Sequence, residues 1–219
     1  MKKNVFGKGL AVLAASILAS AVTLSSAHSA LVSVGGPVST AGVLASIIAA
    51  PVLVTDPVVT NLAQEGFDEM QGVVLGAPIS YDTGVIAAGT RVDSHMIFLN
   101  KPTGGAATVF HTGVLWTFSG TVLGVMSDGV GALEAASTAV LGAAGSTYTA
   151  PYSARGMEGA DAYIIAGSTL LVGMGVSQPG DWIRVVTLSA IPLPATLPLY
   201  GAGLALMGFL GWRKKKASA

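Results

Sequence analysis

Short apolar runs alternate with turn residues through the middle of the chain, from about residue 51 to residue 190. Within several runs the apolar side chains recur at every second position, which is typical of half-buried antiparallel strands. The clearest faces are Val114/Trp116/Phe118, Leu170/Val172/Met174/Val176, and Ile183/Val185/Thr187 set against Trp182/Val186/Leu188. The turn-forming residues Gly, Pro, Asn and Asp separate these runs and predict nine strands. The strands are 72–75, 79–86, 91–99, 107–110, 114–118, 121–126, 162–165, 169–176 and 181–188.

Residues 133–142 (LEAASTAVLG) form the one segment that reads as a helix. Gln178-Pro179-Gly180-Asp181 suits a type II turn and predicts a hairpin between the last two strands. Nine short strands at this spacing predict an all-β domain over residues 51–190, an antiparallel β-sandwich or jelly roll. Residues 28–50 are small and apolar, and we expect an N-terminal extension that packs weakly or forms an early strand and turn.

The first 27 residues have the three parts of a secretory signal peptide. Three lysines stand among the first eight residues, the apolar run Gly9–Leu24 follows, and small residues lead up to Ala27. We predict cleavage by signal peptidase after Ala27, with Ala30 as a second choice. The alternative is an anchor helix that stays uncleaved.

The C-terminal end carries a second hydrophobic segment. Residues 191–212 contain no charged side chain, and the basic cluster Arg213, Lys214, Lys215 and Lys216 follows at once. Three prolines discourage helix in the first part, so the predicted transmembrane helix runs from about Leu199 to Trp212. The basic cluster is a membrane stop that keeps the C-terminus in the cytoplasm and places the middle of the chain outside.

The sequence Ile191-Pro192-Leu193-Pro194-Ala195, followed by a Gly-punctuated apolar run and RKKK, closely resembles the PEP-CTERM sorting signal in its VPLPA variant. Ile191 replaces the commoner Val, and the Pro-Glu-Pro of the namesake motif is absent. The resemblance implies a tail read by an exosortase in a Gram-negative bacterium that makes exopolysaccharide. It also implies export across the inner membrane, a membrane-anchored precursor, and a final place at the cell surface or in the extracellular matrix. The alternative is a single-span tail anchor without processing.

Composition and charge exclude several kinds of site and partner for the middle segment. The chain has 52% hydrophobic residues, 10% charged residues and no Cys, which excludes a disulfide scaffold and a Cys-ligated metal site. Between the two ends lie four basic and all eleven acidic residues, a formal charge of −7. This balance argues against nucleic acid as a partner and favours divalent cations or a hydrated anionic matrix bridged by them.

Candidate catalytic chemistry is sparse. Asp93 and His95 fall on the same face of a predicted strand, where a carboxylate could orient an imidazole, but Ser94 points to the opposite face. No HxH, HExxH or GxSxG pattern occurs. We therefore predict no enzyme, no metal site and no catalytic residue, with an envelope hydrolase as the least favoured alternative. The acidic loops around Asp128, Glu158, Asp161 and Asp181 leave Ca²⁺ open as a ligand, although no DxDxDG loop is present.

Aromatic residues raise one binding hypothesis. Trp116 and Trp182, with Tyr148 and Tyr152, could form a platform on which sugar rings stack, although Trp on an alternating strand is more often core. Three segments, VDSHMIFLN, LGVMSD and GDWIRVVT, also resemble those of other PEP-CTERM proteins without an assigned activity. That resemblance implies an all-β domain and no catalytic residue. The expected function is a non-catalytic envelope or matrix role linked to exopolysaccharide, with a carbohydrate-binding module or adhesin as the alternative.

Overall fold

The structure is a computed structural model, and it describes residues 30–54, 61–101, 107–151, 153–177 and 180–189, with Gly203, Leu204 and Met207 of the tail. The domain is all-β with antiparallel sheets, apart from two short parallel pairings. Its elements are β1 (Leu31–Gly35), β2 (Ser46–Ile47), β3 (Leu53–Val54), β4 (Glu65–Asp68), β5 (Val73–Val74), β6 (Ile79–Tyr81), β7 (Gly84–Ile86), β8 (Arg91–Leu99), β9 (Val109–Phe118), β10 (Val122–Met126), α2 (Ala132–Leu141), β11 (Thr147–Tyr148), β12 (Ala162–Ala166), β13 (Thr169–Val176) and β14 (Asp181–Leu188).

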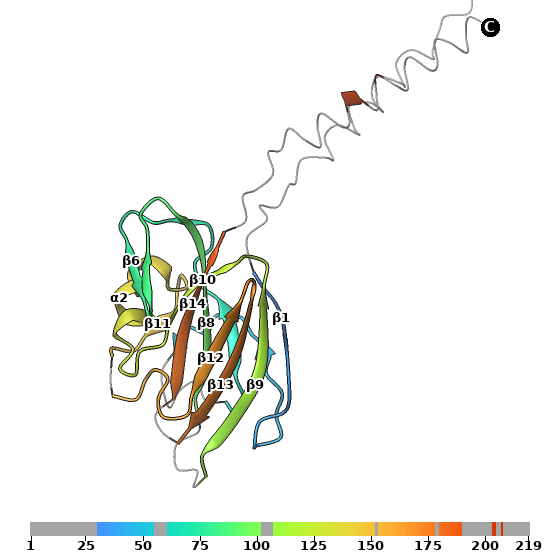
Figure 1. The fold of residues 1–219 in the computed structure, drawn as a ribbon, viewed down its shortest axis with the longest axis vertical. Coiled ribbons are helices and arrows are strands. Elements are labelled where there is room, and N and C mark those ends of the chain that lie inside the picture. The colour runs from blue at the N-terminus through green and yellow to red at the C-terminus, as the bar shows by residue number, and fades with distance from the viewer. Residues whose placement is uncertain are drawn as a thin grey trace, which may run out of the picture. The chain divides into compact units, whose positions relative to one another are not determined.

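Two sheets make up most of the domain. The β9 sheet has the strand order β1-β9-β13-β12, and the β8 sheet has the order β10-β14-β8-β4-β2, with β5 paired to β8. The main hydrophobic cluster takes side chains from both sheets, so the sheets face each other across it (Figure 1). Its buried members include Trp116, Val172 and Met174 from one sheet and Ile97, Ile183 and Val185 from the other.

A third layer covers the other face of the β8 sheet. Two further hydrophobic clusters join Met96, Phe98 and Trp182 to β3 and the chain after α2, and Val92 and Val186 to Leu141 of α2. Figure 1 shows α2, β6 and β11 together on this side. Because β8 and β14 have side chains packed on both faces, nearly all their residues are buried, and the prediction that β14 is half-buried is wrong. The prediction is correct for β13, whose even-numbered side chains alone are fully buried.

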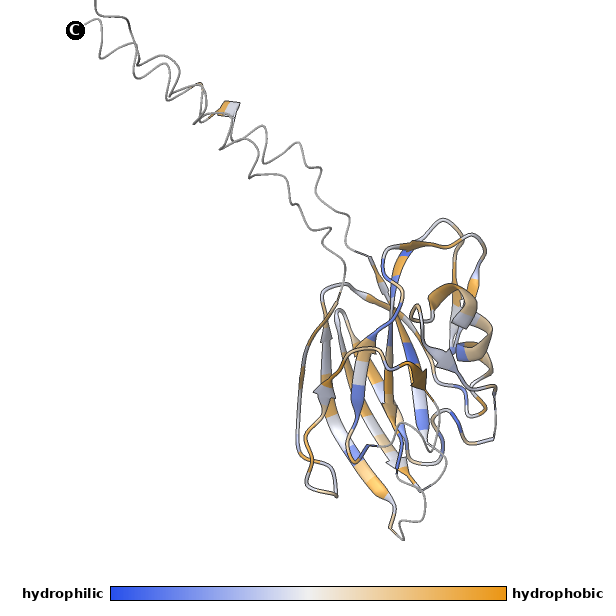
Figure 2. Cartoon of the chain, turned by 180° about the vertical axis from the view of Figure 1, so that it is seen from behind, coloured by the Kyte–Doolittle hydropathy of each residue, from blue (hydrophilic) through white to orange (hydrophobic). Residues whose placement is uncertain are grey.

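Close packing between the sheets depends on a glycine in β4. A Cβ atom at Gly66 would lie 2.6 Å from Cζ3 of Trp116, well inside van der Waals contact. The Trp116 ring therefore reaches from the β9 sheet to the backbone of the β8 sheet. Figure 2 shows hydrophobic and hydrophilic residues alternating along the strands.

The region that sequence set apart as an extension contributes β1 and β2, which pair with β9 and β4 in the two sheets. The described strands belong to one compact unit within His28–Ala190. The described strands thus begin at Leu31 rather than after residue 50.

The last two long strands are not a hairpin. β13 pairs with β9 and β12, whereas β14 pairs with β8 and β10, so the chain crosses from one sheet to the other between them. The predicted turn joins the two layers of the domain instead of two paired strands, and its residues Gln178 and Pro179 lie outside the described part. Both strands have an apolar face that packs into the same core. The crossing allows this, because it places the two strands in the two sheets that enclose the core.

Candidate functional site

The strand that carries Asp93, Ser94 and His95 is central in the β8 sheet, and all three residues are fully buried. Ser94 and His95 project to opposite faces, as the strand period predicts. The His95 ring lies 4.9 Å from the Phe118 ring of the β9 sheet, and the Ser94 hydroxyl donates to Glu69 Oε2 at 2.6 Å on the other face. The hypothetical catalytic group is therefore divided between two packed layers and closed to solvent.

Asp68, not Asp93, orients the imidazole of His95. Asp68 Oδ1 lies 2.7 Å from His95 Nδ1, because the two residues are opposite each other on β4 and β8. The second ring nitrogen, Nε2, lies 3.1 Å from the Thr187 hydroxyl. The Asp93 carboxylate accepts instead from the backbone N–H of Gly72. The carboxylate at Nδ1 of His95 therefore comes from a strand 27 residues away in sequence, and not from Asp93 on the same strand as the sequence had suggested.

His111 is a second fully buried imidazole, and it joins the two sheets. Its Nδ1 accepts from the backbone N–H of Gln64 at 2.9 Å, and its Nε2 donates to the carbonyl of Pro37 at 3.0 Å. The Gln64 side chain in turn donates to the His111 carbonyl and accepts from Trp116 Nε1 at 2.9 Å. These hydrogen bonds hold β9 against the segment before β4, and the Nε2 bond also ties β9 to the chain after β1.

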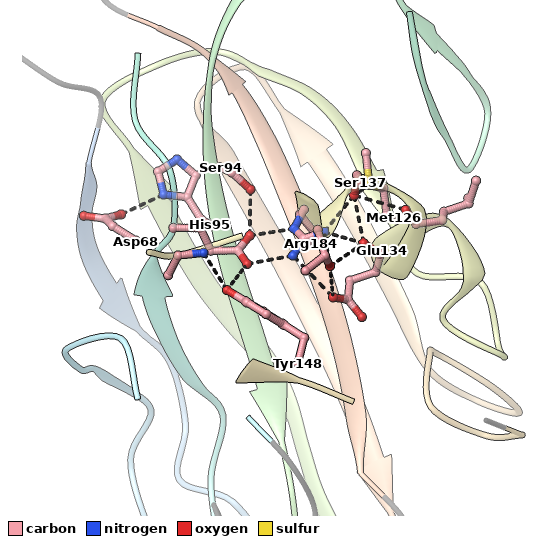
Figure 3. Close-up of polar contacts among 12 residues, drawn as sticks. Asp68, Ser94, His95, Met126, Glu134, Ser137, Tyr148 and Arg184 are labelled. Carbon is pink, nitrogen blue, oxygen red and sulfur yellow. Dashed lines mark hydrogen bonds and ion pairs between the residues drawn. The ribbon is translucent and has the colours of Figure 1, made fainter. Parts of the chain in front are cut away.

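A polar cluster centres on Arg184 in β14 and lies between the β8 sheet and the α2 layer (Figure 3). Arg184 forms a two-pronged ion pair with Glu69, with Nε–Oε2 at 2.7 Å and Nη2–Oε1 at 2.8 Å. Its Nη1 donates to the carbonyl of Glu134 and to the Ser137 hydroxyl on α2. The hydroxyl of Tyr148 donates to Glu69 Oε1 at 2.6 Å. One guanidinium thereby fixes α2 onto the sheet.

A second arginine extends this cluster. Arg155 pairs with Glu134, and its guanidinium lies 4.8 Å from the centre of the Trp182 ring. Two acids and two arginines, all with side chains at most 1% exposed, make the cluster formally neutral. Burial raises the pKa of Glu134, and Arg184 and Arg155 oppose that shift. Burial alone would lower the pKa of Arg184, but Glu69 outweighs it and holds that pKa above its ordinary value.

Sequence reasoning missed this cluster. Its one signal was two arginines, Arg155 and Arg184, in a segment with only four basic residues, the second inside the apolar run WIRVV. A charged side chain in such a run requires a buried partner. The partners Glu69 and Glu134 lie 115 and 50 residues away along the chain, so their identity depends on the fold.

The two tryptophans of the proposed sugar platform lie in different clusters. Trp116 is in the core between the sheets and is 0% exposed, and Trp182 lies under the α2 layer and is 1% exposed. Neither ring offers a face to a ligand, so this platform is incompatible with the structure. Tyr148 is partly buried and bonded to Glu69, and Tyr152 lies outside the described residues.

The acidic loops serve two different purposes. Asp128 accepts from the backbone N–H groups of Ala132 and Leu133, at 2.8 and 2.9 Å, and so satisfies two of the unpaired N–H groups in the first turn of α2. Asp181 is buried close to Asp161 and Glu158, and burial followed by the charge of Asp161 raises its pKa to about 9. Within the described ranges, no three His, Asp or Glu side chains are grouped so that they could hold a metal ion.

The predicted sites at the two ends fall on residues that the structure leaves undescribed. These are Ala27, the motif Ile191, Pro192, Leu193, Pro194 and Ala195, and the basic cluster Arg213, Lys214, Lys215 and Lys216. Among the residues that are described, no helix has the length and apolar character needed to cross a membrane. No family model, curated protein or solved structure matches this chain.

Proposed function

We propose that this protein is exported to the cell envelope or extracellular matrix, sorted by an exosortase through its C-terminal tail, and has a non-catalytic structural or surface role linked to exopolysaccharide. The observation that carries the proposal is the tail itself. A Pro-Leu-Pro motif, an apolar segment and a basic stop follow one another at the end of a chain that begins with a signal peptide pattern. In this proposal the domain is an antiparallel β-sandwich of jelly-roll type between a signal-peptide helix and a transmembrane helix.

The non-catalytic part of the proposal is supported by how the described domain uses its reactive side chains. His95, His111 and Ser94 are fully buried, and each is hydrogen-bonded within the protein. The Glu69–Arg184 pair is likewise enclosed beneath α2. Catalysis requires a group that reaches a substrate, and these groups instead join layers of the fold.

The test is intact mass spectrometry of the protein from envelope and secreted fractions of its native host. Sorting predicts a mature chain that begins at His28 and ends near residues 192–195, with or without an added group. A chain that keeps residues 213–219 in every fraction would overturn the exosortase assignment and leave a simple membrane anchor.

A pair of variants ties any cut to the motif. Pro192→Ala combined with Pro194→Ala should leave the full tail attached, because the motif no longer presents its two fixed φ angles to the enzyme. The neighbouring Thr196→Ala is the matched control and should mature normally. Normal maturation of the double variant would contradict the proposal.

A further inference from the structure

Among the described residues, strand β12 is an edge of the β9 sheet with no strand on its outer side. It pairs with β13 over five consecutive residues, Ala162 to Ala166, without a register shift, and the sheet order ends at β12. A strand in this position presents a row of backbone donors and acceptors to whatever lies beside it. Four of its five residues are exposed, including Ile164 at 63% and Ile165 at 40%.

Proteins usually protect such an edge with charge, proline or a bulge, and β12 has none of these. Its sequence is Ala-Tyr-Ile-Ile-Ala. The opposite edge of the same sheet is built differently: β1 has a register shift between Leu31 and Ser33, and the Leu31 N–H is tied to Asp68 of the β8 sheet. The open edge is therefore at β12.

The outer face that adjoins this edge is uncharged. The four strands of the β9 sheet contain no Asp, Glu, Lys or Arg. Apolar side chains are exposed along it, including Ile164, Leu171 and Leu115. A groove of about 210 Å³ lies across β9, β13 and β12 and is lined by Thr112, Ala162, Ile164 and Gly173 among others. The formal charge of −7 comes from the β8 sheet, α2 and the loops, together with Asp56 outside the described residues.

We propose that two copies of this chain associate through their β12 strands, antiparallel and related by a two-fold axis at Ile164. This register pairs all five residues: Ile164 faces its counterpart, Tyr163 faces Ile165, and Ala162 faces Ala166. It also keeps the apolar outer faces of both copies on the same side, because opposite residues in an antiparallel pair point the same way. The two four-stranded sheets become one continuous sheet across the axis.

The charge distribution identifies a second copy as the occupant. Two strongly acidic molecules repel each other wherever their charged surfaces meet, so an uncharged edge is where close approach costs least. A basic partner would gain nothing from this face, and an anionic polysaccharide would find no cation on its strands. A two-fold interface also needs a self-complementary patch, which a strand paired antiparallel with itself provides.

The absence of cysteine makes the full chain suited to a cross-linking test in host cells. Pairing places the two Ile164 Cα atoms about 4.5–5.5 Å apart, within the span that a disulfide requires. Ile164→Cys should therefore form a disulfide-linked dimer when cells are treated with a mild oxidant. Two other single variants are matched controls: Val52→Cys, exposed at 79% on a loop, reports random collisions, and Leu115→Cys reports face-to-face packing of the β9 sheet.

The expected dimer fraction for Ile164→Cys is about tenfold that of Val52→Cys, because paired thiols meet at a high effective concentration. Co-expression of Ala162→Cys with Ala166→Cys should give a mixed disulfide-linked dimer. The fraction of this mixed dimer should exceed the homodimer fraction of either variant expressed alone. Equal fractions for Ile164→Cys and Val52→Cys would overturn the proposal, as would the highest fraction for Leu115→Cys. Cross-linking of Ile164→Cys only to a different protein would also overturn it and identify another occupant.

A charge at the edge completes the test. Ile164→Lys should abolish the mixed Ala162→Cys/Ala166→Cys dimer, because it sets two like charges opposite each other at the axis. The exposure of Ile164 means that this change should leave the fold intact, which the unchanged thermal midpoint of the variant would establish. A mixed dimer that survives with a normally folded Ile164→Lys chain would contradict the register. None of these outcomes depends on whether the tail is cut.

Discussion

Glu69 and Arg184 show how a few charges organise an otherwise apolar domain. Removing two charges from water costs several kcal/mol each, and their attraction recovers this only with good geometry and further hydrogen bonds. The pair meets that condition: Arg184 uses two nitrogens on Glu69, which also accepts from Ser94 and Tyr148. The cluster therefore selects one position for α2 over the sheet, whereas apolar contacts alone would allow several.

Removing one charge from this cluster should be costly. Glu69→Gln leaves two buried arginines facing only Glu134, so we expect the free energy of unfolding to fall by about 3–5 kcal/mol. Urea unfolding followed by tryptophan fluorescence measures it, because Trp116 and Trp182 are buried in the folded domain. Arg91→Gln is the control at an exposed charge and should change stability by less than about 0.5 kcal/mol.

The companion variant Glu69→Gln/Arg184→Met restores formal neutrality in the cluster. The double change should cost less than the sum of the two single changes, because each single change leaves an unbalanced buried charge. Strict additivity of the two would show that the ion pair has no part in fixing the layer.

Asp181 should make stability depend on pH. Its pKa is raised to about 9 in the fold by burial and then by Asp161, compared with an ordinary value of 3.8. Between these values the folded domain keeps a proton that the unfolded chain has released. The contribution of Asp181 to the free energy of unfolding is therefore fully present below about pH 4. This contribution is lost as pH rises toward 9, by at most about 1.4 kcal/mol per pH unit.

Asp181→Asn should flatten this dependence, because the amide has nearly the shape of the protonated carboxyl and needs no bound proton. Thermal midpoints of the natural chain and the variant, recorded from pH 5 to pH 9, should diverge as pH rises, with the variant more stable at pH 8. Parallel curves would show that the Asp181 carboxyl does not hold a proton in the folded domain.

At the scale of elements, the sequence predicted strands well where local pattern and tertiary packing agree. The bounds of β8, β13 and β14 match the predicted runs 91–99, 169–176 and 181–188, and α2 is displaced by one residue from 133–142. These segments are long, and each has a continuous apolar face. The period of side chains was enough to find them.

Glycine and short turns produced the errors at this scale. The prediction ended one strand at Phe110 and began another at Val114, but β9 is continuous, and Gly113 at φ +73° lies where the pairing with β13 shifts. A bulge and a turn use the same residue, and sequence alone does not distinguish them. Residues 79–86, predicted as one strand, fold back as the hairpin of β6 and β7. Strands of two residues, such as β3 and β11, carry no pattern and went unpredicted.

At the scale of the whole molecule, the sequence drew attention to some polar residues in apolar strands but did not show which side chains meet. His95 was singled out from the sequence, whereas Arg184 was not, although a charged group in an apolar strand also needs a partner. Their partners Asp68 and Glu69 are adjacent in sequence yet project to opposite faces of the β8 sheet, one toward each neighbouring layer. Assigning them required the pairing of β4 with β8, which is a property of the assembled fold.

The charge of the whole molecule also predicts how salt affects the association proposed at β12. Each copy has a formal charge of −7 between its two ends, and the axis brings these charges together while the paired strands contribute none. Raising the ionic strength from about 0.01 to 0.15 M shortens the screening length from about 30 to 8 Å. In membranes isolated from host cells, the dimer fraction of Ile164→Cys relative to Val52→Cys should therefore rise with sodium chloride. A fall would mean that ion pairs hold the copies together, which an uncharged β12 edge could not provide.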